Sequence, residues 1–379
     1  MNHETAVSNA NEIVDHILAP AARQNDRDAR FSSEAVAALG PAGLLGIMLP
    51  TEVGGSDLGP RTFAAVVAAL AEADASAAMV YLMHTSATAT IAAARPGATV
   101  AQTLRHISAG KHLTTLAFSE AGSRSHFWAP VSTARPDGDR VVLDAQKSFA
   151  TSASRASAYV WSSKPLQPDS GLSTLWLVPA DSPGIRVHGP FNGLGLRGND
   201  SSPISADGTS IPATAMLGED GKGFDIMMGT VLPMFNVLSA ACSVGLMEAA
   251  VQRTALHASA ARYAHLDAKL ADLPTIRSYI ARMRIRADMA RTLLDDTIAA
   301  LETGRADTML RVLSCKAAAG DAALEVLDTA MRVCGGAAFR KDLALERYFR
   351  DGQAASVMGP TTDVLYDFVG KAVCGMNLF

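Results

Sequence analysis

The sequence predicts an α+β protein with three domains, in the order helices, strands, helices. The chain of 379 residues is too long for one compact core. Apolar residues recur at helical spacing in both end regions, whereas the region between them alternates short β-rich runs with Gly, Pro, Asp and Ser. We expect an N-terminal all-helical domain over 1–112, a middle β domain over 113–221 and a C-terminal helix bundle over 222–379.

The N-terminal region is rich in Ala and Leu. In "FSSEAVAALGPAGLLGIMLP" apolar residues recur at intervals of three and four residues, which predicts a helix. Ser32 or Ser33 can cap this helix, and Gly40-Pro41 ends it. The segment "RTFAAVVAALAEADASAAMVYLMHTSATATIAAA" predicts two further helices that are apolar nearly all round and therefore buried. His84 lies in the second, where a lone histidine is more often a satisfied core residue than a catalyst.

The middle region contains the runs "LTTLAFS", "RVVLDA", "AYVWSS", "STLWLVP" and "GIRVHG". Their regular spacing between turn residues predicts an antiparallel barrel or sandwich. The segment "GLGLRG", Gly193 to Gly198, matches the dinucleotide-binding pattern, but "NDSSPISADGTSIP" follows it instead of a helix. We therefore favour a glycine-rich hairpin over a Rossmann fold.

The C-terminal region contains the long helical segment "DLPTIRSYIARMRIRADMARTLLDDTIAALETG". Asp272 can cap it, Pro274 falls in its first turn and Gly304 ends it. Its apolar stripe suits a helix bundle, within one subunit or across a homodimer or homotetramer. The stripe consists of Ile276, Ile280, Met283, Ala287, Ala290, Leu294, Ile298 and Leu301.

Composition excludes several classes of protein. The formal net charge is −4 and no run of five basic residues appears, which argues against nucleic-acid binding. The four cysteines are far apart and no histidine stands at metal-ligand spacing, so we expect neither a metal site nor a disulfide framework. The acidic start "MNHETAVSNANEIVDHI" is unlike a signal peptide, and no apolar run approaches the ~20 residues of a membrane span. We expect a cytoplasmic protein with no membrane partner.

Six segments, in order, resemble the acyl-CoA dehydrogenase superfamily of flavoproteins. "GLLGIMLPTEVGGSDLG" resembles its N-terminal signature, "LAFSEAGSRS" its Thr-Glu-Pro-x-Ala-Gly-Ser-Asp segment, and "RVVLDAQKSFATSAS" its strand ending in Lys-x-Trp-Ile-Thr-Asn. "GLGLRGNDSS" and "AMLGEDGKGFDIMM" are similar to the exit of its β domain. "MRVCGGAAFRKDLALERYFRD" is similar to its Gly-Gly turn followed by Glu-Arg-x-x-Arg-Asp.

This resemblance implies FAD, held between the β domain and the C-terminal bundle. Ser119 takes the place of a threonine whose hydroxyl and backbone meet the flavin pyrimidine. Phe149 and Thr151 fall where the family has an aromatic residue that packs on the isoalloxazine and a threonine near N5. Thr361 and Asp363 match positions that cap a helix beside the phosphate and ribose of FAD.

Further matching positions imply contacts with a second subunit and with substrate. Gly335 and Gly336 correspond to a turn that approaches the FAD of a neighbouring subunit, which implies a homodimer or homotetramer. Arg332 replaces a glutamine and adds charge for the FAD diphosphate, or is simply a charge near a helix C-terminus. Arg262 lies near the place of the family's arginine for the FAD pyrophosphate, although no Phe-Gly follows it. Ser123 corresponds to a serine that contacts the thioester arm of the substrate.

The chain departs from the family at the catalytic base. The usual glutamate, which removes the α-proton of the acyl group, falls on Gly359, and the alternative position on a helix falls on Phe235. A positioned general base is worth about 10²- to 10⁴-fold in rate. The arginine that helps to hold coenzyme A falls on Asn236. An acyl group tethered to an acyl or peptidyl carrier protein is therefore an alternative substrate.

Three functions remain open at this point. The first is an FAD-dependent oxidoreductase that acts on an acyl thioester in specialised metabolism, with a base such as His84 or one supplied by the substrate. The second is a flavin-dependent monooxygenase that uses O₂ and needs no carboxylate at Gly359. The third is a flavin-binding scaffold without dehydrogenase activity, against which the retained flavin-contact positions argue.

Overall fold

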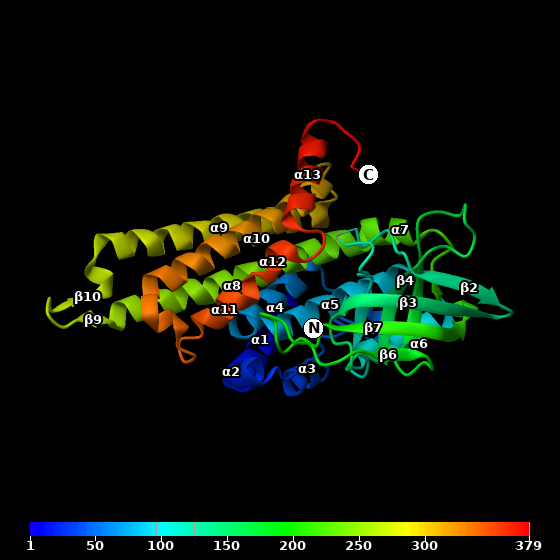
Figure 1. The fold of residues 1–379 in the computed structure, drawn as a ribbon, viewed down its shortest axis with the longest axis horizontal. Coiled ribbons are helices and arrows are strands. Elements are labelled where there is room, and N and C mark those ends of the chain that lie inside the picture. The colour runs from blue at the N-terminus through cyan, green and yellow to red at the C-terminus, as the bar shows by residue number, and fades with distance from the viewer. Residues whose placement is uncertain (95–96, 125, 379) are drawn as a thin grey trace.

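The computed structural model describes residues 1–94, 97–124 and 126–378, and it has the predicted order of helices, strands and helices (Figure 1). The first N-terminal helices lie at the bottom in this view, the strands lie at the right and the long C-terminal helices extend to the left. The N-terminal helices are α1 (His3–Ile13), α2 (Ala19–Asp28), α3 (Ser33–Leu39), α4 (Pro60–Ala73), α5 (Ala75–Ala93) and α6 (Ala98–Ser108).

The middle region is a sandwich of two open four-stranded sheets. One sheet has the order β1-β4-β5-β8 and the other β2-β3-β7-β6. Side chains from both sheets, among them Leu143, Trp161 and Trp176, form the core between them. The opposite face of the first sheet packs on helices. The strands are β1 (Thr114–Ala117), β2 (Thr133–Asp137), β3 (Arg140–Ala150), β4 (Ala158–Ser163), β5 (Thr174–Pro179), β6 (Ile185–Val187), β7 (Ser202–Pro212) and β8 (Met216–Leu217).

The expectation of purely antiparallel pairing is wrong at one place, because β1 runs parallel to β4. The 15 residues between Ala117 and Thr133 cross to the second sheet, and the chain returns to the first only at β4. The β1–β4 connection is therefore a crossover, which allows parallel pairing. The segment "GLGLRG" is not a dinucleotide-binding turn: residues 193–198 lie in the long loop that joins the antiparallel neighbours β6 and β7, in line with the predicted hairpin.

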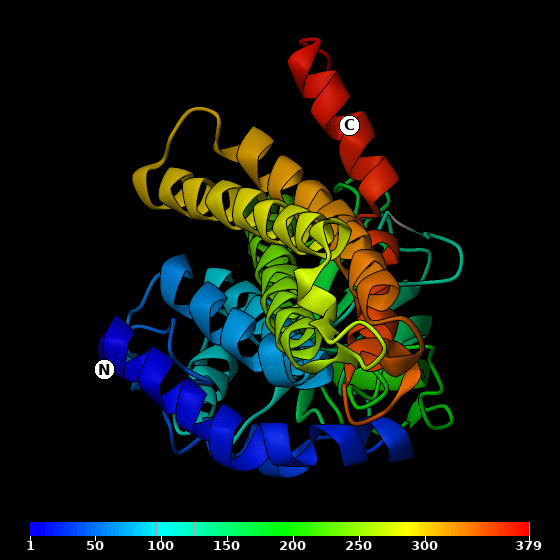
Figure 2. The same ribbon diagram turned by 90° about the vertical axis from the view of Figure 1, so that its left-hand side faces the viewer.

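The C-terminal region contains three long helices that pack side by side (Figure 2). Its helices are α7 (Gly223–Ile226), α8 (Leu232–Ala260), α9 (Pro274–Thr303), α10 (Thr308–Cys334), α11 (Leu345–Gly352), α12 (Ala354–Val357) and α13 (Thr362–Val373), and a short hairpin, β9 (Arg262–Tyr263) and β10 (Ala268–Lys269), joins α8 to α9. α13 packs on α10 and then projects from the body of the subunit.

The apolar stripe of α9 lies inside the subunit. Met283, Ala287 and Leu294 are buried in the same core as residues of α4, α8 and α10. The sequence left open whether the stripe packs within one subunit or across an oligomer. The stripe packs within the subunit and does not face a second copy of the chain. The predicted end at Gly304 is confirmed, with φ +62°. The predicted cap Asp272 is wrong: its carboxylate accepts the Lys269 N–H in the preceding turn, and α9 begins at Pro274.

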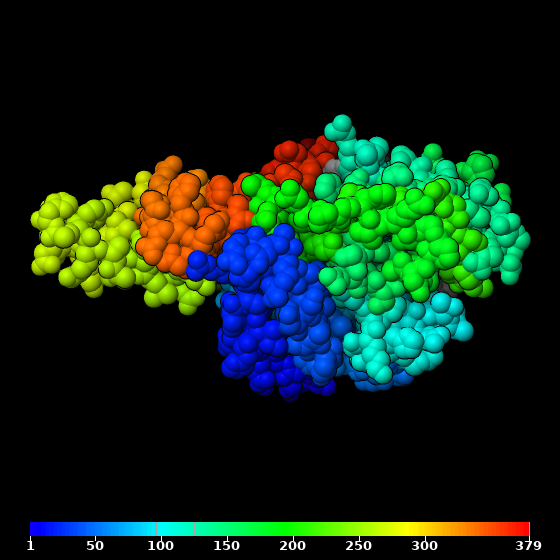
Figure 3. Space-filling model, turned by 60° about the horizontal axis from the view of Figure 1, so that its bottom comes forward, coloured from blue at the N-terminus to red at the C-terminus, as the bar shows by residue number. Residues whose placement is uncertain are grey.

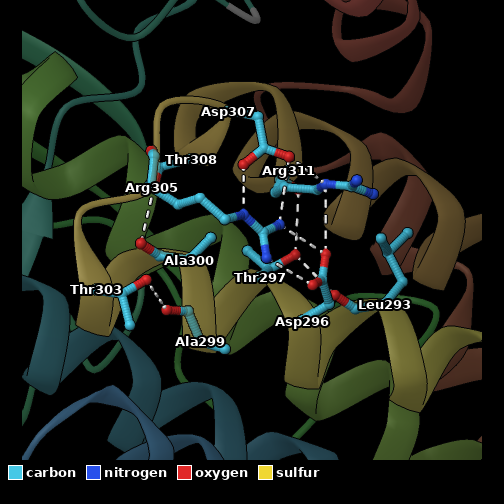
Figure 4. A network of polar contacts seen from close by, with 10 residues as sticks. All are labelled: Leu293, Asp296, Thr297, Ala299, Ala300, Thr303, Arg305, Asp307, Thr308 and Arg311. Atoms are coloured by element: carbon cyan, nitrogen blue, oxygen red, sulfur yellow. Dashed lines mark hydrogen bonds and ion pairs between the residues drawn. The ribbon is translucent and has the colours of Figure 1, made fainter.

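A ring of charges closes the corner between α9 and α10 (Figure 4). The Arg305 guanidinium donates to both oxygens of Asp296 at 2.8 and 2.9 Å and pairs with Asp307, while Arg311 pairs with both acids. Each of the four side chains is more than a third exposed, so solvent screens the network.

Residues Gly223–Ala260 form one helical run that is long and apolar enough to cross a membrane. However, 83% of its most apolar window is buried inside the subunit, where α8 packs between α4, α9 and α10. Burial of this kind is typical of the central helix of a globular bundle.

Candidate functional site

A cavity of about 920 Å³ opens where the sandwich meets the C-terminal helices. Its walls come from α5, the turn after β1, the end of β3, the loop 191–201, the start of α8 and the segment 350–361. These segments are distant in the sequence, so only the packing of the sandwich on the bundle creates the space. Apolar side chains such as Met83, Phe127 and Phe235 form much of its lining.

The cavity brings together six of the residues singled out in the sequence: Ser119, Phe149, Thr151, Phe235, Gly359 and Thr361. Phe149 is 65% exposed although it is a large apolar residue, so its ring is available to a flat ligand. The Thr151 hydroxyl lies 3.0 Å from the Ser201 hydroxyl. Thr361 caps α13 by accepting the Val364 N–H at 3.4 Å, so the positive end of that helix faces the cavity wall.

His84 does not lie in this cavity, and its assignment as a base is wrong. Its ring is fully buried, Nε2 donates to the carbonyl oxygen of Leu45 at 3.0 Å and Nδ1 accepts the Thr114 N–H at 3.1 Å. Burial lowers the pKa of His84 to about 4. With both nitrogens engaged by backbone groups, His84 joins α5 to β1 and has no free site for a substrate proton.

Two further predicted residues lie close to the cavity but do not line it. Ser123 is buried, and its hydroxyl donates to the carbonyl oxygen of Glu120 at 3.4 Å within the same turn. Asp363 is exposed in the first turn of α13, two residues after Thr361. Contacts of either residue with substrate or cofactor stay predictions.

Four predicted cofactor residues lie outside the cavity of their own subunit. Arg262 is exposed in β9, near the far end of the bundle, and pairs with Asp267 at 3.6 Å. Arg332 is exposed near the end of α10, over the ring of Tyr279. Gly335 and Gly336 follow, and a Cβ atom at either position would meet nothing within 4 Å. Both glycines are exposed, so in the described part of the subunit the side-chain face of this turn is open.

Sequence reasoning missed a buried ion pair at the cavity. Glu120 lines the space, and its carboxylate accepts from the Lys147 ammonium, the Ser132 hydroxyl at 2.5 Å and the backbone N–H groups of Val131 and Ser132. Burial disfavours the charged carboxylate, but Lys147 and these donors outweigh that effect and lower the pKa of Glu120. A signal existed: Lys147 occupies an inward position in the alternating pattern of β3.

A second buried lysine supports the turn that carries Gly359. The Lys316 ammonium donates to the carbonyl oxygens of Ala355, Met358 and Pro360 at 3.4, 3.0 and 2.7 Å. Burial lowers its pKa to about 8. Its place between the buried residues Cys315 and Ala317 could have indicated a special role. Lys316 thus fixes the backbone of the wall in which Gly359 stands.

The lining offers a flat apolar surface and several hydroxyl groups, but no free base. Among the described residues that line the cavity, Glu120 is the one acidic side chain and there is no histidine. Both oxygens of Glu120 are occupied by donors, so this carboxylate holds the sheet together and is not available to accept a proton.

Three family models match almost the whole chain. The acyl-CoA dehydrogenase N-terminal domain matches residues 2–107, the middle domain 115–209 and the C-terminal domain 221–374. Among curated proteins, the chain is similar to the mitochondrial short-chain specific acyl-CoA dehydrogenase of Bos taurus. The two are 27% identical over 365 residues, which cover 96% of this chain and 87% of that protein.

Several solved structures have the same fold. The structure of PigA with FAD and proline superposes with a TM-score of 0.91 at 19% identity, covering 98% of this chain and 97% of that one. The prolyl acyl carrier protein oxidase AnaB superposes with a TM-score of 0.88 at 18% identity, covering 98% and 99%. At this level of identity the two structures support the fold alone.

Proposed function

Because the chain belongs to the acyl-CoA dehydrogenase family, we propose that it oxidises an acyl group that is bound as a thioester, by a route that uses no carboxylate at the usual position. The cofactor of this family is FAD, which accepts a hydride from the substrate. The observation that carries the proposal is the cavity: four of the residues predicted to contact flavin line it, yet its described lining has no acid free to accept a proton.

The residues present fit FAD. The exposed ring of Phe149 provides an apolar surface for the isoalloxazine, and the hydroxyls of Ser119 and Thr151 lie along the same cavity. Thr361 and the N-terminus of α13 provide positive potential suited to a phosphate. The cavity can thus bind a flat ring and an anionic tail along one wall.

The part of the cavity expected to hold the substrate differs from that of a standard acyl-CoA dehydrogenase at two positions, Gly359 and Phe235. Both line the cavity, and neither has a group that accepts a proton. The α-proton must therefore leave to solvent, to the substrate itself or to a group outside the lining. We expect slow turnover of simple saturated acyl groups, because a positioned base is worth about 10²- to 10⁴-fold.

The carrier of the acyl group is either coenzyme A or an acyl or peptidyl carrier protein. Asn236, at the position of the family's arginine for coenzyme A, is fully buried and donates to the carbonyl oxygen of Val312 at 3.3 Å. Its side chain carries no charge for a diphosphate. This favours a carrier protein and a role in specialised metabolism, and the similar fold of a prolyl acyl carrier protein oxidase is consistent with that choice.

A second copy of the chain would complete the FAD site. Arg262, Arg332, Gly335 and Gly336 are exposed on the bundle. The face of α9 turned away from the core carries the exposed side chains of Ile285 and Met289, and the projecting α13 exposes Val373. Apolar groups of this kind favour association, so we propose a homodimer or homotetramer in the cytoplasm. Light scattering and cell fractionation test these two statements.

The reaction is tested by anaerobic mixing of the FAD-loaded protein with butyryl-CoA, octanoyl-CoA and acyl carrier protein thioesters, while flavin absorbance near 450 nm is followed. We expect slow or no bleaching with the plain acyl-CoAs and faster bleaching with carrier-bound acyl groups. Rapid bleaching by butyryl- or octanoyl-CoA would contradict the absence of a base.

The same lack of a base also favours a second function, a flavin-dependent monooxygenase that uses O₂. Bleaching by no thioester, together with O₂-dependent oxygenation of an acyl substrate by the chemically reduced enzyme, would support it. A protein that binds neither FAD nor FMN in equilibrium dialysis would exclude both functions.

A further inference from the structure

A second hollow, of about 320 Å³, lies between α2, the loop 193–197 and α11. Leu194 and Arg350 line both this hollow and the large cavity, so the two are neighbours. In Figure 3 the blue N-terminal helices meet the orange segment that leads into α11. The hollow is lined by six basic side chains and two acidic ones, namely Arg23, Arg27, Arg197, Lys341, Arg347, Arg350, Asp26 and Glu346.

Both acidic side chains are already neutralised. Arg350 donates to both oxygens of Asp26 at 2.9 and 2.6 Å and to Glu346 at 2.8 Å. Lys341 pairs with the other oxygen of Glu346 at 2.8 Å. These contacts pair one arginine and one lysine with the two acids, and the remaining arginines provide the excess of positive charge.

Arg347 is the strongest indication that this hollow binds an anion. The residue is 5% exposed, and its guanidinium lies over the ring of Tyr348 at 4.9 Å. One terminal nitrogen has no hydrogen-bond partner, and no ion pair joins the side chain to an acid within the described ranges 1–94, 97–124 and 126–378. The Asp351 carboxyl is attracted by Arg347 but accepts the Leu196 N–H at 2.6 Å. A buried guanidinium with an unused donor is costly unless an anion pairs with it.

Two more arginines at the hollow form no ion pair within the part of the chain that the structure describes. Arg23 is exposed on α2. Arg197 donates to the carbonyl oxygen of Asp26 at 2.8 Å, which leaves its charge uncancelled. Arg27 pairs only with its neighbour Asp28, at 2.9 Å.

The N-terminus of α11 adds positive potential to the same wall. This eight-residue helix begins after Ala344, which lines the hollow, adopts φ +63° and provides no side-chain cap. The first N–H groups of a helix attract anions when no side chain accepts from them. Helix N-terminus and guanidinium groups together form the combination that binds phosphate oxygens in many proteins.

We propose that this hollow is a binding site for the phosphate or diphosphate group of a small molecule, separate from the flavin cavity. Guanidinium groups fit a tetrahedral oxyanion with two parallel hydrogen bonds, so the Arg347 guanidinium gains an anionic partner and Arg23 and Arg197 reach the outer oxygens. The site does not depend on the proposed oxidation, because no residue of the argument has to contact the thioester.

The test is isothermal titration calorimetry of the FAD-loaded protein with inorganic pyrophosphate, inorganic phosphate and ADP at low ionic strength. We expect saturable binding of pyrophosphate that weakens as salt is added, with flavin absorbance unchanged. Arg23→Gln should weaken binding about tenfold and Arg23→Glu more, because one charge-assisted contact is lost or reversed. Arg105→Gln, at an exposed arginine of α6, is the matched control and should bind as the wild type does.

The three probes distinguish the sources of the anion. Tighter binding of ADP than of pyrophosphate would identify a nucleotide, and equal binding would identify a free phosphate or diphosphate. If the FAD-loaded protein binds none of the three, or if Arg23→Glu binds pyrophosphate as well as the wild type does, the proposal is wrong. Because Arg23 is exposed, both variants should keep the wild-type melting temperature, which excludes misfolding as the cause.

Discussion

The two lysines buried beside the large cavity are stabilised in opposite ways. Lys147, behind the sheet wall, meets the Glu120 carboxylate and also donates to the Ser162 carbonyl oxygen at 2.7 Å. Lys316, behind the helical wall, donates to three carbonyl oxygens and has no acid within ion-pair distance among the described residues. The first forms a neutral pair, whereas the second buries a net positive charge.

This difference predicts how each wall of the cavity responds when a partner is removed and when the pH changes. A buried pair with all its hydrogen bonds made is costly to break from either side. Burial lowers the pKa of both lysines to about 8, but the Glu120 carboxylate opposes this shift at Lys147, whereas no described acid opposes it at Lys316. We expect the sheet wall to depend most on the presence of both partners, and the helical wall, which carries Gly359, to depend on the protonation of Lys316 alone.

The largest effect is expected from Glu120→Gln. The substitution leaves the Lys147 ammonium buried without its counter-charge, so the free energy of unfolding should fall by about 3–5 kcal/mol in urea denaturation. Glu325→Gln is the matched control, because Glu325 pairs with Arg286 at 2.8 Å on the surface and both side chains are about half exposed. The control should lose about 1 kcal/mol or less.

The double variant Glu120→Gln/Lys147→Met sharpens this test. Removing both charges leaves no unpaired ion, so the double variant should be more stable than Glu120→Gln alone. A Glu120→Gln protein that unfolds at the same urea concentration as Glu325→Gln would show that the sheet wall does not depend on the pair.

An intermediate effect is expected from pH at Lys316. Its pKa of about 8 in the folded protein lies below the ordinary 10.5, so between these two values the unfolded chain binds the proton and the folded protein does not. The free energy of unfolding should therefore rise with pH from about 8 to 10.5, by at most about 3 kcal/mol at 1.36 kcal/mol per unit.

Lys316→Met isolates that contribution from the other groups that titrate at alkaline pH. The difference in unfolding free energy between wild type and Lys316→Met should grow over this window. A difference that stays constant from pH 7 to pH 10.5 would contradict the assignment. Hydrogen exchange of residues 353–361 should also be faster in Lys316→Met, because three carbonyl oxygens of the turn lose their donor.

The smallest effect is expected at the exposed ring of charges between α9 and α10. Arg305→Gln removes the centre of that network, but all four side chains are partly solvated (Figure 4). We expect a loss of about 1 kcal/mol or less, and a smaller loss at 1 M salt. A loss as large as that of Glu120→Gln would show that the contribution of an ion pair to the stability of this protein does not depend on its burial.

Local sequence patterns predicted much of the fold and part of the site. The end of α9 at Gly304 is confirmed, because a left-handed residue after an apolar-periodic segment is a local signal. The segment "RVVLDAQKSFATSAS" likewise located Phe149 and Thr151 at the end of a strand beside the cavity. The first prediction rests on a local signal, and the second on the resemblance of this segment to the family.

The hydrogen-bond partners of buried polar side chains could not be predicted from local sequence patterns. The sequence placed His84 in a buried helix but not its two backbone partners, Leu45 and Thr114, which lie 39 and 30 residues away. At Lys316 the sequence showed only a charged residue among apolar ones. Its acceptors could not be predicted, because they lie some 40 residues further along the chain.

The sequence by itself therefore determined the order of helices and strands, the apolar face of each and the family of flavoproteins to which the chain belongs. The tertiary structure decided what each face meets: the stripe of α9 packs inside the subunit, His84 is structural, and the Gly335-Gly336 turn is open to solvent. The physical reason is that periodicity and turn chemistry act over a few residues, whereas burial and hydrogen-bond partners are set by segments far apart in the chain.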